Sequence, residues 1–143
     1  MRGSLWLTVF LACLVAVAVP AAAIAQSMEK APGGARVGIA QPMNGATVSS
    51  PVTVVMTTVY IQVKPAGEVV SGTGHHHLVI DDVPPAAGDV VAKDATHLHF
   101  GKGQTEATLD LAPGIHTITA QFADGLHRSY GPQLTHTIVI RVR

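Results

Sequence analysis

The stretch TEATLDLAPGIHTITAQFA, residues 105–123, decides the fold. Apolar and polar side chains alternate on both sides of the Pro113-Gly114 dipeptide, with Leu109 and Leu111 on either side of Asp110. A period of two places the apolar side chains on one face of a strand, and Pro-Gly between two such runs marks a turn. The stretch therefore predicts two consecutive strands, each with one buried face.

Segments of the same kind recur along the chain from residue 36 onward. They are rich in Val, Ile and Thr, are separated by turns containing Pro or Gly at a spacing of roughly eight to twelve residues, and show no helical period. This pattern predicts an all-β fold, an immunoglobulin-like β-sandwich of about seven strands over residues 36–143. The expected strands are 37–40, 52–61, 75–81, 96–100, 105–111, 115–123 and 134–142.

Residues 1–25 have the organisation of a signal peptide. Arg2 precedes an uncharged apolar run over residues 5–19, and Ala23-Ile24-Ala25 supplies the small residues of a cleavage site. We expect cleavage after this site, then a flexible lead over residues 26–35, and a periplasmic or secreted protein that does not contact the membrane. An uncleaved membrane anchor is the alternative interpretation of the apolar run.

Charge and cysteine content exclude several classes of function. The chain has 9 Lys and Arg against 9 Asp and Glu, without the basic stripe that nucleic-acid binding requires. The single cysteine, Cys13, lies in the predicted signal peptide, so we expect no disulfide, iron–sulfur cluster or thiolate copper site in the mature protein. No hydrolase or metalloprotease motif occurs. We therefore expect a protein that is not an enzyme.

Eight histidines are the compositional anomaly of the chain. His75, His76 and His77 open the third expected strand, where alternation sends the first and third to one face and the middle one to the other. His97 and His99 share a face of the next strand. Two neighbouring strands that each offer such a pair could bring imidazoles together, and neutral imidazole is the commonest metal ligand in proteins.

Three other histidines stand alone. His116 and His136 lie on the apolar faces of their strands, which favours a structural role with a hydrogen bond near a sheet end. His127 follows the Asp124-Gly125 turn, and its role stays open between structure and ligation. Copper(II) and zinc suit a donor set of imidazoles. The candidate metal ligands are His75, His76, His77, His97, His99 and His127.

These observations predict a non-enzymatic periplasmic binding protein that holds copper or zinc on a histidine-rich strand face. The alternative is a cell-envelope module for a small ligand or a protein partner, with a structural histidine cluster and no metal. A third hypothesis is an enzyme in which a histidine-bound metal activates water, with Glu106 or Asp81 as a nearby base.

Four strings follow one another along the sequence: Gly72-Thr73-Gly74-His75-His76-His77-Leu78, His97-x-His99-Phe100-Gly101-x-Gly103-Gln104-Thr105-Glu106-Ala107-x-Leu109, Pro113-Gly114-x-His116-Thr117 and Asp124-x-x-His127. Together they resemble an exported bacterial family of domains of unknown function. The resemblance extends from about Val37 to Val142 and implies an exported β-sandwich, without an established activity.

Overall fold

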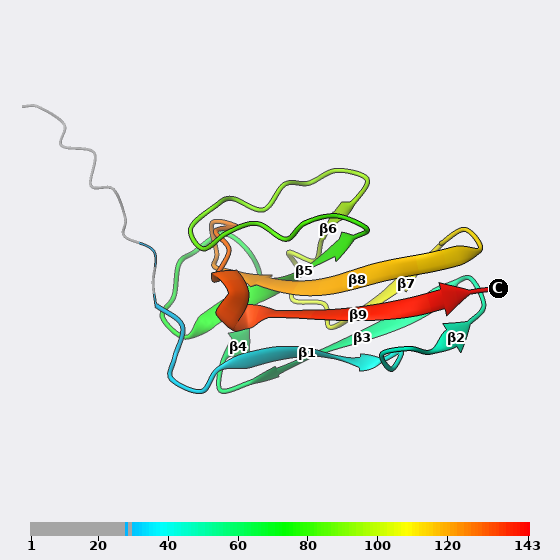
Figure 1. Ribbon diagram of the computed structural model, residues 1–143. Coiled ribbons are helices and arrows are strands. Elements are labelled where there is room, and N and C mark those ends of the chain that lie inside the picture. The colour runs from blue at the N-terminus through cyan, green and yellow to red at the C-terminus, as the bar shows by residue number, and fades with distance from the viewer. Residues whose placement is uncertain (1–27, 29) are drawn as a thin grey trace, which may run out of the picture.

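A computed structural model describes residue 28 and residues 30–143, and the predicted signal peptide lies outside the described residues. This part of the chain forms nine strands in two sheets and one short 3-10 helix, η1 (Gly131–Leu134) (Figure 1). Nowhere within it does a helix have the length and hydropathy needed to cross a bilayer.

The smaller sheet contains three antiparallel strands in the order β1-β3-β7. In the central strand, Val52, Val54 and Met56 are buried and alternate with more exposed residues, as the period of two requires. The strands are β1 (Arg36–Gln41), β3 (Val52–Val59) and β7 (Glu106–Leu109).

The larger sheet has six strands, and β5 lies near one of its edges. The order is β2-β9-β8-β5, and two short strands share the remaining edge of β5. β4 pairs in parallel with the start of β5, and β6 pairs antiparallel with its second half. The strands are β2 (Thr47–Val48), β4 (Gln62–Val63), β5 (Thr73–Ile80), β6 (His97–His99), β8 (Gly114–Ala123) and β9 (Thr135–Val142).

The two sheets pack face to face, which confirms the predicted all-β sandwich. One sheet holds β1, β3 and β7, the other holds β5, β8 and β9, and this division is immunoglobulin-like. All seven expected strands are present, with ends that differ from the expected ones by at most two residues. β2 and β4 were not expected, because a two-residue strand is too short to show alternation.

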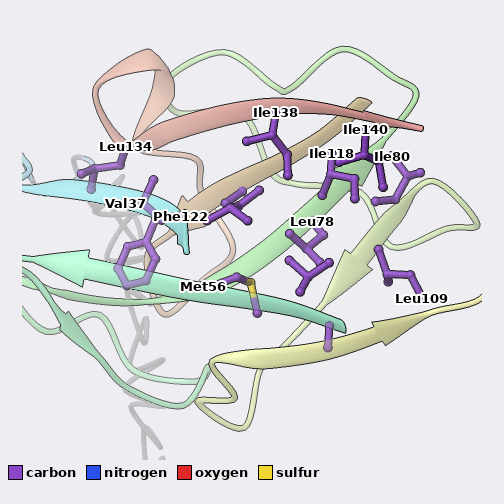
Figure 2. Packing of buried hydrophobic residues seen from close by; sticks show 14 of the residues in the cluster. Val37, Met56, Leu78, Ile80, Leu109, Ile118, Phe122, Leu134, Ile138 and Ile140 are labelled. Atoms are coloured by element: carbon purple, nitrogen blue, oxygen red, sulfur yellow. The ribbon is translucent and has the colours of Figure 1, made fainter. Parts of the chain in front are cut away.

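The hydrophobic core lies between the sheets. Figure 2 shows side chains from both sheets pointing toward one another. Burying one such Leu, Ile or Phe side chain contributes about 1.5–3 kcal/mol. Ala31 and Ala35, which fall in the predicted lead, are also buried in this cluster. The largest core side chains are Phe122, Leu78, Ile118, Leu134, Ile138 and Ile140.

The outer face of the larger sheet is partly covered by the segment between β5 and β6, residues 81–96 (Figure 1). The amide of Val91 donates to the carbonyl of His127 (2.9 Å), and the amide of Ser129 donates to the carbonyl of Asp89 (2.8 Å). Val79 points away from the sandwich core, yet it is completely buried. The outer face of β5 therefore offers a second environment shielded from water.

Candidate metal centre

Strand β5 supplies two imidazoles to its outer face. His75 and His77 are two residues apart, opposite in direction to the core residue Leu78, and are 0% and 1% exposed. Their Nε2 atoms lie 3.0 Å apart. The Nδ1 atom of each ring has no hydrogen-bond partner among the described residues. This is an unusual state for buried polar atoms, most of which are hydrogen-bonded in folded proteins.

Strand β6 adds a third imidazole beside this pair. The register places His99 directly opposite His77, and the His99 ring centroid lies 5.1 Å from those of both His75 and His77. Gly101 makes room for this ring, because a Cβ atom at position 101 would overlap the His99 imidazole. One ring nitrogen from each of the three histidines lies within 4.8 Å of those of the other two.

A turn after β8 carries the fourth imidazole. The chain reverses between Ala123 and Ser129, which pair with each other, and His127 in this turn has a φ of 66°. The carboxylate of Asp124 holds the turn: it accepts from the amide of Leu126 (2.9 Å) and from the amide (3.0 Å) and Nε (2.8 Å) of Arg128. Asp124 is 1% exposed, so it acts as a buried anchor for the turn.

The four imidazoles are in mutual contact. The Nε2 atoms of His127 and His99 lie 3.1 Å apart, and all six pairs of ring centroids are separated by 4.7 to 5.9 Å. We call His75, His77, His99 and His127 the histidine cluster. It combines a buried pair from one strand with two partly exposed rings from β6 and the 124–128 turn.

Burial and mutual repulsion lower the pKa values of three members of the cluster, His75, His77 and His99. Burial, followed by the charges of His75, His99 and His127, lowers the pKa of His77 from 6.5 to about 2. Burial, followed by His127 and His99, lowers the pKa of His75 to about 4. Burial and His127 also lower the pKa of His99. A neutral imidazole keeps one nitrogen lone pair, which is the form that binds metal.

The spacing of the rings suits one shared ion. Zinc–nitrogen bonds of 2.0–2.1 Å at tetrahedral angles separate the ligand nitrogens by about 3.3 Å. The two short Nε2 separations in the cluster, 3.0 and 3.1 Å, are close to that value. His75, His77 and His99 could therefore hold a metal ion together, and the ring of His127 contacts all three of them.

Two of the predicted ligands are not brought to the cluster. His76 points into the sandwich core, is 0% exposed and packs edge-to-face on Phe122, with ring centroids 4.9 Å apart. Burial lowers its pKa to about 4. The Nδ1 atom of His97 lies 2.9 Å from Oδ1 of Asp94 and 3.0 Å from the hydroxyl of Thr96. His97 therefore has local polar partners in place of the other imidazoles.

The two solitary strand histidines have the structural roles expected for them. Nδ1 of His116 lies 2.7 Å from Oδ2 of Asp81, and its Nε2 lies 2.8 Å from the carbonyl of Ala112. The hydrogen bond to Asp81 raises the pKa of His116. Nδ1 of His136 accepts a hydrogen bond from the amide of Ile39 (3.2 Å), which links the two sheets.

The carboxylates considered as catalytic bases are engaged or placed elsewhere. Asp81 binds His116 and accepts from the amide of Thr117 (2.7 Å), and Glu106 is exposed on β7 of the smaller sheet. The acid beside the cluster is Asp124, whose charge opposes the lowering of the His75 pKa. Its role as the anchor of the turn was missed from the sequence, although the Asp-Gly turn before His127 was a signal for it.

Fold and site together define an all-β sandwich with four imidazoles gathered on the outer face of one sheet. Residues 42–143 match the model of the family described as "Domain of unknown function (DUF4399)", and the chain belongs to this family. The expected membership of a family of domains of unknown function is thereby confirmed. No curated protein and no solved structure matches the chain.

Proposed function

We propose that this chain is a non-enzymatic binding protein of the bacterial cell envelope that holds one divalent transition metal ion, copper(II) or zinc, in the histidine cluster. The observation that carries the proposal is the mutual contact of four imidazoles, two of them fully buried and each with an unpaired Nδ1 atom. The envelope location rests on the signal-peptide pattern of residues 1–25.

A shared ion would offset the unfavourable energy of this arrangement. A buried polar group without a partner costs about 1–3 kcal/mol, and the facing Nε2 atoms of His75 and His77 can share only one proton between them. Protonating several rings at this separation would add repulsion between like charges. A divalent cation instead uses the converging lone pairs and replaces repulsion with coordination bonds.

The donor set narrows the choice of ion. All four donors are imidazole nitrogens, which suit copper(II) and zinc, and copper(II) binds more tightly to a given nitrogen site. Soft thiolate donors, which would favour copper(I), are absent from the described residues.

The arrangement supports binding more than catalysis. Catalytic zinc sites use three protein ligands and leave a fourth position for water, whereas the cluster offers four imidazoles. The adjacent carboxylate, Asp124, is committed to the backbone of its turn and to Arg128. It is therefore poorly placed to act as a general base.

Calorimetric titration of the purified metal-free protein with copper(II) and zinc tests the proposal. We expect one ion per chain. Removing a group that only supports a metal ligand lowers metal affinity about 10- to 100-fold. The variants His77→Ala and His99→Ala remove a ligand itself, so their metal affinity should fall by more than this. His97→Ala is the matched control on the same strand as His99, and its affinity should equal that of the wild type.

Thermal unfolding of each metal-free variant separates loss of a ligand from loss of the fold. Weak binding that responds equally to His97→Ala and His99→Ala would overturn the metal proposal. It would favour the alternative of a cell-envelope interaction module with a structural histidine cluster.

A further inference from the structure

We infer that the ion in the histidine cluster is exchangeable cargo, passed to and from a donor or acceptor through the side formed by His99 and His127. This inference rests on the proposed function and adds how the ion moves and what kind of partner takes it. It follows from the unequal burial and anchoring of the four ligands.

His75 and His77 form a fixed floor. Both are completely or almost completely buried, and both belong to the eight-residue strand β5, which pairs with β8 along residues 75–80. The other edge of β5 pairs with β4 at its start and with β6 in its second half. Between these two stretches, the carbonyl of His76 accepts a hydrogen bond from the amide of Phe100 (3.1 Å). Neither imidazole of this pair can therefore leave the ion and turn toward solvent unless the sheet opens.

His99 and His127 form a rim of a different kind. Both are partly exposed, one at the end of the three-residue strand β6 and the other in the 124–128 turn. Their ring centroids lie 4.7 Å apart and their Nε2 atoms 3.1 Å apart, so the two rings meet at the exposed side of the cluster. An incoming donor atom meets these two ligands first.

The backbone on each side of the rim is held, so the mobile parts are the two side chains. The amides of Ala66 and Gly67 donate to the carbonyls of Gly101 and Gly125 (both 2.9 Å), and the amide of Val91 donates to the carbonyl of His127 (2.9 Å). Rotation of a partly exposed side chain takes picoseconds to nanoseconds, whereas opening of a sheet is many orders of magnitude slower. The rim can open without unfolding the site.

This division of ligands has a direct chemical consequence. A partner with nitrogen or sulfur donors can replace His99 and His127 one at a time while His75 and His77 still hold the ion. The partner is therefore a second metal carrier or a small chelating molecule that approaches the exposed side. A closed structural zinc site would instead release its ion only when the fold opens.

Transfer kinetics test this inference. The protein is first loaded with zinc to one ion per chain, and transfer to a chromophoric chelator is followed by stopped-flow absorbance over a range of chelator concentrations. Hydrogen exchange of the β5 amides, measured in parallel, gives the rate at which the sheet opens. We expect the transfer rate to rise in proportion to chelator concentration and to exceed the opening rate of β5.

A transfer rate that is independent of chelator concentration and equal to the opening rate would overturn the inference, because the ion would then be a closed structural one. Failure to load any ion would instead overturn the proposed function. The variant His127→Ala should transfer its ion faster than the wild type at every chelator concentration, by about 10- to 100-fold. His97→Ala should transfer at the wild-type rate, and equal rates for His127→Ala and the wild type would also refute the role of the rim.

Discussion

Replacing His76 by leucine should stabilise the protein. The imidazole of His76 is 0% exposed in the core between the sheets, and neither of its nitrogens has a hydrogen-bond partner among the described residues. Leucine has a similar volume and no polar atoms, so His76→Leu removes the unpaired group without leaving a large cavity. The histidine cluster on the opposite face of β5 keeps all its members.

The size of the gain follows from two opposing terms. An unpaired buried polar group costs about 1–3 kcal/mol, and the edge-to-face contact of His76 with Phe122, which leucine cannot make, is worth about 0.5–1.5 kcal/mol. The polar term is larger. We therefore expect a net stabilisation of about 1 kcal/mol, which raises the Tm of a domain of this size by about 4 °C.

Urea unfolding of the metal-free wild type, His76→Leu and His76→Ala checks this expectation. His76→Ala is the control, and it should destabilise the protein because the smaller side chain leaves a cavity. Since burial lowers the pKa of His76 from 6.5 to about 4, the unfolded wild type binds a proton in that range that the folded protein does not. The advantage of His76→Leu should therefore grow as the pH falls through this range. A loss of stability in His76→Leu, or a loss of metal affinity, would refute the assignment of His76 to an unsatisfied core position.

Three further predictions concern the cluster and its surroundings. The variant Gly101→Ala places a methyl group against the ring of His99, so the metal affinity measured by titration should fall about 10- to 100-fold. The Tm of the metal-free protein should change little. Unchanged affinity would contradict the close packing of Gly101 and His99. Since the pKa values of His75 and His77 are lowered, the metal-free wild type should be most stable above about pH 6.5 and should lose stability as the pH falls. This loss should be steeper than in a variant with both histidines replaced by alanine. Urea midpoints that fall equally with pH in the two proteins would count against the cluster. Since Asp81 raises the pKa of His116, the stability from this pair should be complete below about pH 6.5 and lost as the pH rises through the folded pKa; an NMR titration of His116 that is unchanged in Asp81→Asn would disprove the coupling.

The strands could be predicted because their signals are local. Alternation over residues 105–123 located both β7 and β8, and the turn dipeptides separated the remaining strands. Alternation also placed His75 and His77 on one face of β5 and His76 on the other, as observed. It could not show that His76 lies in the core, because both faces of this strand are buried.

The complete cluster could not be predicted because it depends on contacts between distant parts of the chain. His127 joins it only because the chain folds back from Ala123 to Ser129, and the sequence gives no register for that reversal. The spacing of His97 and His99 predicts that both bind the same ion. The ring of His97 instead lies within hydrogen-bonding distance of the carboxylate of Asp94, three residues earlier. Spacing along a strand therefore indicated that imidazoles would come together, and tertiary contacts determined which histidines do so.

The three consecutive histidines of β5 also affect the register in which β5 pairs with β8 during folding. Leu78, Val79 and Ile80 are apolar on both faces, so hydrophobicity alone would tolerate a shift of β5 by one residue against β8. Such a shift would turn His75 and His77 into the core and His76 outward. Gly74 opposes the same shift, because in the native alignment its missing side chain admits the ring of Phe122 and the carbonyl of Ala123. A bound ion would stabilise only the correctly aligned strand, so metal capture would also select against misaligned chains.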